Sequence, residues 1–248
     1  MGVLLSLFDY TGAWSRPFEE AGWTVVQVDL KHGHDVHAFT ARGLYADFQG
    51  YESIDGILAA PPCTDFACSG AAHFAAKDAD GRTSASVRLV YQALRTVELF
   101  KPDFWALENP IGRLPRLVPE LGARSLVFDP CDFAGYTDPS ADDLDRLDSL
   151  RGVVERGERL SAESVELVKH VGAYTKRTVL WGRFKAPTPH RIEPVRCTAQ
   201  GSWLQALGGS SERTKAERSV TPAGFARAFC EAQIGAAVQT APELAMAA

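Results

Sequence analysis

The chain has 248 residues, 46% of them hydrophobic and 23% charged, which suits one large α/β domain or a domain with a small appendage. Its net charge of −5 excludes the overall basic field that is typical of many nucleic-acid-binding proteins. Nine acidic residues against four arginines between Asp138 and Glu166 account for that charge. The remainder is therefore neutral, and a local basic face is still compatible with the sequence.

The cysteines and the N-terminal residues bound the compartment. The five cysteines form no CxxC pair and show neither zinc spacing nor a disulfide framework: Cys63, Cys68, Cys131, Cys197 and Cys230. The N-terminus lacks the basic start of a signal peptide, and its apolar run is far below the roughly 20 residues of a membrane helix. We expect a cytoplasmic protein with no metal and no membrane partner, in which a free thiol can act as a nucleophile.

The first two predicted strands frame a turn of the nucleotide-binding type. Apart from Ser6 and Gln27, residues 3–8 and 24–28 are apolar or β-branched, and a short helix separates them. Gly12 follows the first strand, and Asp29 follows the second. Glycine lets the backbone approach a ligand, and a carboxylate at that place accepts both ribose hydroxyls. Asp35 is a candidate acceptor for an adenine amino group, with a solvated loop aspartate as the alternative.

A third apolar run, 57–60, predicts a buried strand that delivers a cysteine. The strand ends at Pro61 and Pro62, because neither proline can donate to a sheet ladder. Cys63 is therefore placed at the carboxyl end of a strand, the edge of an open α/β sheet where ligands bind. A buried cysteine beside a turn is the alternative. Residues 64–84 are predicted to form a long loop that acts as a lid or binding loop.

A further helix and strand bring a carboxylic acid to the same edge. We predict a helix over 85–100 and a strand over 104–107, which delivers Glu108 shortly before Pro110. Cys63 and Glu108 would then follow successive strands of one sheet.

The rest of the chain alternates helices and strands around an acidic insertion. We predict a helix at 112–121, a strand at 125–128, a helical insertion at about 137–172, a strand at 178–181 and a last helix from 221 to 234. We expect a main domain at 1–185, a small basic recognition-like segment at 186–217, and a C-terminal part at 218–248 in which a helix returns to the main domain before a frayed tail.

These motifs resemble those of the DNA cytosine-5 methyltransferase family, specifically its small phage-type members, over nearly the whole chain. The nucleophile motif of the family is similar to Pro61-Pro62-Cys63 with Phe66, Ser69 and Gly70. Its Glu-Asn-Val motif is similar to Glu108-Asn109-Pro110, and its FxGxG opening to residues 8–12. Arg177 matches the second of a pair of arginines before a strand, with Thr175 at the first position. The late Arg-x-Leu-Thr motif is similar to residues 218–221.

The resemblance implies a Rossmann-like fold of the S-adenosylmethionine-dependent methyltransferases, mostly parallel with helices on both faces, in a bacterial or phage-infected cell. Residues 1–185 would be the catalytic domain. The implied ligands of S-adenosyl-L-methionine, and of the product S-adenosyl-L-homocysteine, are Phe8, Tyr10, Thr11, Gly12, Asp29, Leu30, Asp35, Val36 and Pro61.

The chemistry of this family explains the residue types. Cytosine C5 is a poor nucleophile, and addition of the Cys63 thiolate to C6 converts the ring to an enamine whose C5 is nucleophilic. A carboxylic acid at N3 and a cation at O2 relieve the developing charge, and Glu108 and Arg177 suit those roles. The base must leave the duplex, at roughly a few kcal/mol of unstacking. Residues 64–84 would close over it, and Cys68 is assigned as a structural thiol.

The implied partner is DNA, most simply double-stranded. Predicted phosphate contacts are Ser69, Lys77, Arg82, Arg191, Arg196, Arg213 and Lys215. Solvated loop charge is the alternative for Lys77 and Arg82. Because the segment 186–217 is small for a base-reading surface, we expect short or relaxed sequence specificity. The acidic insertion is expected to bind a protein partner or to be purely structural.

Other interpretations stay open. The same chemistry could act on RNA or on a free nucleotide. The departures from the family pattern at Tyr10 and Ala236 allow a modified S-adenosylmethionine as the donor. A catalytically inactive relative could bind DNA or cofactor and regulate a partner, although such a protein would need none of Cys63, Glu108 and Arg177.

Overall fold

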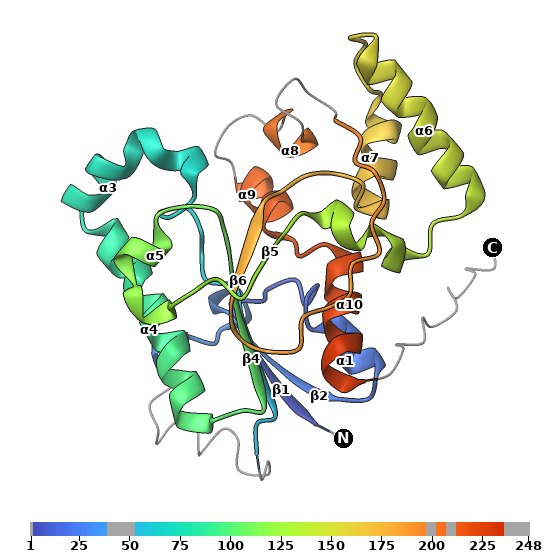
Figure 1. Ribbon diagram of the computed structural model, residues 1–248. Helices are drawn as coiled ribbons and strands as arrows, with labels where there is room; N and C mark the ends of the chain where they lie inside the picture. Colours follow the sequence, from blue (N-terminus) through green and yellow to red (C-terminus); the bar gives the residue numbers. More distant parts are fainter. Residues whose placement is uncertain (1, 39–52, 197–201, 207–211, 236–248) are drawn as a thin grey trace.

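The computed structural model describes residues 2–38, 53–196, 202–206 and 212–235 (Figure 1). The strands found among them join in one sheet: β1 (Val3–Leu7), β2 (Thr24–Val28), β3 (Gly56–Ala59), β4 (Phe104–Pro110), β5 (Leu126–Phe128) and β6 (Thr178–Arg183). Their order is β2-β1-β3-β4-β6-β5. The pairs β1–β2, β1–β3 and β3–β4 are parallel, whereas β6 runs antiparallel to both β4 and β5.

Helices cover both faces of this sheet. The described α-helices are α1 (Arg16–Glu20), α3 (Phe74–Ala79), α4 (Arg82–Phe100), α5 (Leu114–Leu117), α6 (Ala141–Glu155), α7 (Ala162–Val171), α8 (Trp203–Ala206), α9 (Glu212–Ser219) and α10 (Ala223–Ile234). In Figure 1, α4 and α5 lie on one side of the sheet, and α1 and α10 lie on the other. The predicted α/β, Rossmann-like class with a mostly parallel sheet is confirmed.

Alternation along the strands builds one core under each layer of helices, because successive side chains of a strand point to opposite faces. Leu5 and Leu7 of β1 belong to the cluster that includes Val90 of α4. Leu4 belongs to the other cluster, which includes Phe225 of α10. All five side chains are fully buried. The sheet is therefore fixed from both sides, and its carboxyl edge is a stable platform.

A third core joins the acidic insertion to the basic segment that follows it. The cluster contains Leu147 of α6 and Val168 of α7, together with Val195 and Trp203. Trp203 is 4% exposed, and its ring lies edge-on to Tyr174 with centroids 5.5 Å apart. The insertion is helical, as predicted, and the residues that pack against α6 and α7 are Ile192, Val195, Trp203 and Leu204. Trp203 therefore has a packing role and is not available to stack on a base.

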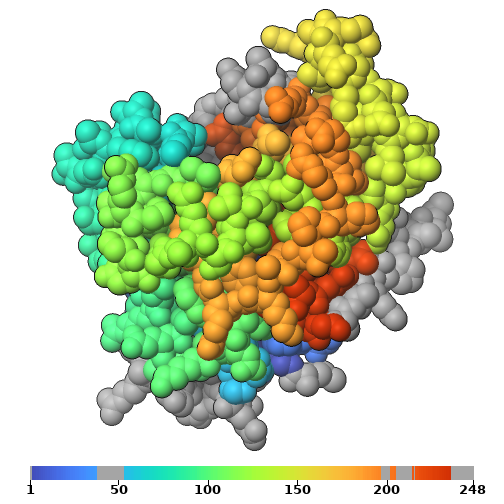
Figure 2. Space-filling model, viewed as in Figure 1, coloured from blue at the N-terminus to red at the C-terminus, as the bar shows by residue number. Residues whose placement is uncertain are grey.

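The prediction of a long loop at 64–84 is wrong. Residues 68–73 form a 3₁₀-helix, η3 (Cys68–His73), which continues into α3, and α4 begins at Arg82. Gly81, with φ 82°, makes the turn between α3 and α4. The run of alanines in this segment has high helix propensity, which outweighs its loop-like composition. We call residues 68–79 the α3 arm, and Figure 2 shows α3 (cyan) and the α6–α7 hairpin (yellow) as projections on opposite sides of the molecule.

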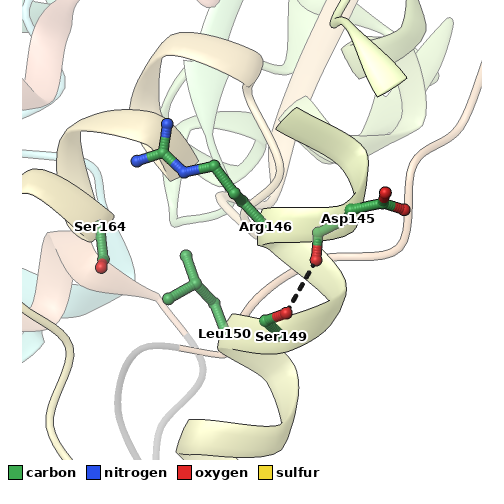
Figure 3. A pocket seen from close by; sticks show the side chains of 5 residues that line it. All are labelled: Asp145, Arg146, Ser149, Leu150 and Ser164. Atoms are coloured by element: carbon green, nitrogen blue, oxygen red, sulfur yellow. Dashed lines mark hydrogen bonds between the residues drawn. The ribbon is translucent and has the colours of Figure 1, made fainter. Parts of the chain in front are cut away.

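The α6–α7 hairpin contains a hollow of about 240 Å³ lined by Asp145, Arg146, Ser149, Leu150 and Ser164 (Figure 3). Ser149 donates a hydrogen bond to the Asp145 carbonyl at 3.0 Å, and Arg146 pairs with Glu163 across the two helices. Because all five lining residues belong to α6 or α7, the hollow lies apart from the sheet edge that holds Cys63. In the part of the chain that the structure describes, no helix has the length and hydropathy to cross a membrane.

Candidate active site at the carboxyl edge of the sheet

The registers of the parallel strands bring the predicted residues to one edge. Leu7 of β1 pairs with Val28 of β2 and with Ala59 of β3, and Ala59 pairs with Leu107 of β4. The residues that follow this row are Phe8, Asp29, Ala60 and Glu108. The order of the strands reverses at β1, which has β2 on one side and β3 on the other. Such a switch point is where open α/β sheets bind their ligands.

Glu108 lies inside β4, not after its end. The sequence predicted that the strand stops at Leu107, but Glu108, Asn109 and Pro110 pair with Leu180, Val179 and Thr178 of β6. Pro110 tolerates this position because it is the last residue of the strand. The antiparallel partner therefore holds the Glu108 backbone in the sheet.

The segment 63–68, which we call the nucleophile loop, is tied to the residues that follow Glu108. The Cys63 carbonyl accepts hydrogen bonds from the N–H groups of Phe66 and Ala67, both at 2.9 Å. The Cys68 N–H donates to the Ile111 carbonyl at 3.1 Å, and the Arg113 N–H donates to the Phe66 carbonyl at 2.9 Å. The loop thus follows the chain beyond β4 closely, and Cys63 is held relative to Glu108.

Gly112 is required where these two segments meet. A Cβ added to it would lie 1.9 Å from the Phe66 carbonyl oxygen, a backbone atom that cannot rotate away. We expect Gly112→Ala to lower the free energy of unfolding by about 1–3 kcal/mol, measured by urea denaturation. In the matched control Gly152→Ala, the new Cβ on α6 meets only the end of a flexible arginine side chain. That control should raise the free energy of unfolding by about 0.5–1 kcal/mol. Equal effects at the two glycines would contradict the close approach.

Asn109 joins the ends of β3 and β4. Its side chain is fully buried, and its Nδ2 donates to the Pro61 carbonyl at 3.0 Å. We expect Asn109→Ala to cost about 1–3 kcal/mol of stability in urea denaturation, because a buried carbonyl loses its donor. The exposed Ser84→Ala change on α4 serves as the control and should stay within about 0.5 kcal/mol of the wild type. A neutral Asn109→Ala variant would show that this hydrogen bond does not join the strands.

The electrostatics couple Cys63 to Glu108. Burial raises the pKa of the Cys63 thiol most, and the Glu108 carboxylate raises it further, whereas Lys176 lowers it. Burial also raises the pKa of Glu108, and Lys176 opposes that shift. Each group therefore favours its neutral form, and ionising one disfavours ionising the other. A protonated Glu108 can donate a proton and removes a negative charge from the surroundings of the thiol.

Arg177, the cation predicted to act at O2, is an exposed side chain with an acidic partner. Its side chain is 61% exposed, and its Nε lies 3.0 Å from the Asp129 carboxylate. Its carbonyl accepts the Ile111 N–H at 3.2 Å, so its backbone belongs to the site. The neighbouring Lys176 is the cation whose charge acts on both Cys63 and Glu108. Lys176 is therefore a second cation close to the two predicted catalytic groups.

The predicted cofactor ligands lie at the ends of β1, β2 and β3, with the exception of Asp35 and Val36, which lie farther along the chain. Phe8 has φ 61°, a backbone conformation that a bulky residue rarely adopts, and Gly12 has φ 65°. Tyr10 is 47% exposed, and Thr11 beside it is also exposed. The β1 turn is therefore sharply bent and open to a ligand.

Residues after β2 fit a nucleoside in chemical type. Asp29 caps the 3₁₀-helix η1 (Leu30–His32) by accepting the Lys31 N–H, while Leu30 beside it is 69% exposed and apolar. A carboxylate next to an exposed aliphatic side chain matches a ribose and a base. Asp35 is exposed, so it can accept from a ligand. Of the other candidates, Phe8 is half-buried, whereas Gly12, Val36 and Pro61 are buried. Val36, at 4% exposed, packs in the core under α4.

The predicted DNA contacts divide into two groups. Ser69, Arg82, Arg191 and Arg196 are exposed. Arg82 forms an exposed ion pair with Asp80 at 2.6 Å, and Arg191 pairs with Asp132 and Glu193. Lys77 is 6% exposed and its Nζ lies 3.3 Å from Asp65, so it takes part in an internal ion pair in place of the predicted phosphate contact. The side chains of Arg213 and Lys215 lie outside the described residues.

Four residues of the site were not assigned a role from the sequence: Asp65, Asn109, Arg113 and Lys176. Lys176 precedes Arg177, and alternate residues of an extended segment point to opposite sides, so this pattern offered a signal. Asn109 lies next to Glu108 in a recognised motif. The partners of Asp65 and Arg113 are distant in sequence, which leaves no local signal. No group of side chains suited to a metal ion occurs within the described ranges.

One comparison with known proteins covers the stretch that contains Cys63 and Glu108. Residues 3–112, less than half of the chain, match the sequence model of the family described as C-5 cytosine-specific DNA methylase. No protein with a curated description matches. A solved structure of a presumed DNA modification methyltransferase, encoded within a prophage of E. coli, is 16% identical with a TM-score of 0.45. The aligned part covers 86% of this chain but 56% of that protein. The stretch that matches the family model runs from β1 to the end of β4 and contains both Cys63 and Glu108.

Proposed function

We propose that the protein is a DNA cytosine-5 methyltransferase of the small, phage type. It would act through a bond between Cys63 and C6 of a cytosine that has left the duplex. The observation that carries the proposal is a half-buried thiol just after β3 beside a half-buried carboxyl group in β4, whose charge raises the pKa of the thiol. Both residues lie in the stretch that matches the family model.

The geometry supports a sequence of steps by these side chains. The Cys63 thiol gives its proton to water, and the thiolate then forms a bond to C6 while protonated Glu108 gives its proton to N3, so that the ring becomes a neutral enamine. The positive charges of Lys176 and of the neighbouring Arg177 would stabilise the negative charge that develops at O2. After transfer, water removes the C5 proton, the S–C6 bond breaks, and N3 returns its proton to Glu108. The Cys63 thiolate takes back a proton from water, so that both the thiol and the acid are restored.

We propose S-adenosyl-L-methionine as the donor. The turn after β1, with Gly12, and the acidic end of β2, with Asp29 and Leu30, would hold it beside the site. When bound, it supplies an electrophilic methyl group. Asp29 would accept the ribose hydroxyls, and the exposed Leu30 would contact the base.

The same proposal extends to the acceptor. We assign double-stranded DNA with short or relaxed sequence specificity, because the segment 186–217 is short for a base-reading surface and its Trp203 is buried. Exposed Ser69, Arg82 and Arg196 would position phosphates. The acidic α6–α7 hairpin repels phosphate, so we assign it a structural or protein-binding role.

The test incubates the protein with methyl-labelled S-adenosyl-L-methionine and duplex DNA, single-stranded DNA, RNA or free nucleotide, and identifies the labelled base by nuclease digestion and mass spectrometry. We expect 5-methylcytosine in duplex DNA. Label found only in RNA or in the free nucleotide would replace the acceptor, and no transfer to any of the four would overturn the enzymatic proposal.

A further inference from the structure

A buried cluster of charges surrounds the nucleophile loop, outside the groups that would touch the substrate. Lys77, Asp65 and Arg113 are 6%, 7% and 9% exposed. Lys77 Nζ lies 3.3 Å from the Asp65 carboxylate and also donates to the Thr64 carbonyl. Ser86 of α4 donates to the other Asp65 oxygen at 2.6 Å. Side chains from α3, from α4 and from Arg113 thus meet at Thr64 and Asp65, the two residues that follow Cys63.

Arg113 is the hub of this cluster. Its Nε donates to the Asp65 carbonyl at 3.0 Å, and its backbone N–H donates to the Phe66 carbonyl. Its guanidinium bonds to both Asp78 oxygens, at 2.9 and 2.8 Å, and to the Thr83 hydroxyl at 2.7 Å. The group also stacks over the Phe74 ring at 3.8 Å. One side chain therefore fastens the nucleophile loop to the α3 arm and to the start of α4.

Stability alone does not account for so much buried charge. Removing charges from water costs several kcal/mol per ion, by rough general estimates, and well-packed apolar residues often serve stability equally well. What such a network provides is a fixed geometry, since Arg113 holds its partners in a rigid, planar fork. Here the fixed object is the backbone at residues 64–66, directly after the thiol.

We propose that Lys77 and Arg113 are positioning residues for Cys63, holding the nucleophile loop so that the thiol stays half-buried and aligned beside Glu108. The use of the thiol as a nucleophile rests on the proposed function, whereas the way in which its loop is held does not. Residues 64–84 are then a single unit and not a free lid, because Lys77 of the α3 arm pairs with Asp65 of the loop and Phe74 of the arm contacts Arg113. The arm and the loop should accordingly move together.

The test measures alkylation of Cys63 by iodoacetamide in the full chain, without DNA or cofactor, with peptide mass spectrometry to separate it from Cys68. Cys68 ends the same loop but is already exposed, so loosening the loop adds little to its reactivity and it serves as an internal reference on the same molecule. Lys77→Met and Arg113→Met should loosen the loop, relieve the burial of the thiol, and raise the Cys63-to-Cys68 alkylation ratio about threefold or more. Arg156→Met, which removes an exposed ion pair with Glu158, should leave the ratio unchanged.

Kinetics supply the second readout. If methyl transfer occurs, both variants should lose about tenfold to a hundredfold in kcat, with KM for S-adenosyl-L-methionine within about twofold, because misplacing a nucleophile slows the chemical step. Faster alkylation with slower transfer is the signature of lost alignment. The alkylation result does not depend on transfer, so failure of the proposed function would not hide it.

An unchanged ratio in folded variants would overturn the proposal, whether neither rate changes or both rise equally, because an equal rise would indicate general loosening. Should Lys77→Met and Arg113→Met fail to fold, Ser86→Ala and Thr83→Val remove single hydroxyls from the same cluster. These milder variants should raise the Cys63-to-Cys68 ratio about 1.5-fold to twofold. Unchanged ratios in both variants would likewise contradict the proposed positioning role.

Discussion

Replacement of Cys63 by alanine is expected to lower kcat for methyl transfer at least about a thousandfold, whereas alanine at Cys68 leaves it within about twofold. The two thiols lie in one short loop, but their settings differ. Cys63 is half-buried next to Glu108, and Cys68 is exposed on the α3 arm. Without the sulfur no bond to C6 can form, so C5 remains a poor nucleophile.

Single-turnover transfer of label to duplex DNA measures this effect, and circular dichroism verifies that both variants are folded. The Cys68→Ala protein is the matched control, since it loses the same group five residues away. Substantial residual transfer by Cys63→Ala, or a comparable loss in Cys68→Ala, would remove Cys63 from the proposed role.

The second large effect is expected from Glu108→Gln, which should lower kcat by about 10²–10⁴-fold. The acid lies in β4 with its backbone fixed by β6, and burial raises its pKa above the ordinary 4.5. The protonated form gives a proton to N3, which an amide cannot do. A pH series of kcat/KM should fall at high pH as Glu108 ionises, and this limb should be absent in the variant.

The same substitution should affect stability in the opposite direction. Because the folded-state pKa of Glu108 is raised, the wild type has its full stability from this group below pH 4.5 and loses it as pH rises through the folded value. Glu108→Gln has no such loss. The variant should therefore unfold at a higher urea concentration than the wild type at neutral pH, with the difference vanishing near pH 4. A variant less stable at both pH values would contradict the raised pKa.

Much of the framework could be predicted from the sequence. Apolar runs that end at a glycine, an acid or a proline located β1 to β4, and parallel pairing then requires their carboxyl ends to share an edge. The thiol of Cys63 and the acid of Glu108 follow from that rule alone. These inferences succeed because each rests on local pattern and on one general property of parallel sheets.

The remaining features depend on contacts between distant residues. β4 runs past Leu107 because β6, about 70 residues later, pairs with it in the antiparallel direction. Lys77 looked like a surface cation in a polar loop, but Asp65 and Thr64 enclose it. The outward position of Arg177 depends on Asp129, which the sequence did not single out. The local sequence does not specify partners that are distant along the chain. Lys77 and Arg177 were therefore predicted to contact solvent, DNA or the target base.

The most direct test of the account uses a duplex in which cytosine carries fluorine at C5. With S-adenosyl-L-methionine present, the bond from sulfur to C6 can form, but there is no C5 proton to remove, and the adduct persists. Denaturing electrophoresis and peptide mass spectrometry then locate the attached nucleotide. The account predicts a covalent complex linked through Cys63 that requires the methyl donor, and none with Cys63→Ala. Absence of any adduct in a protein that transfers methyl groups, or attachment at Cys68, would contradict it.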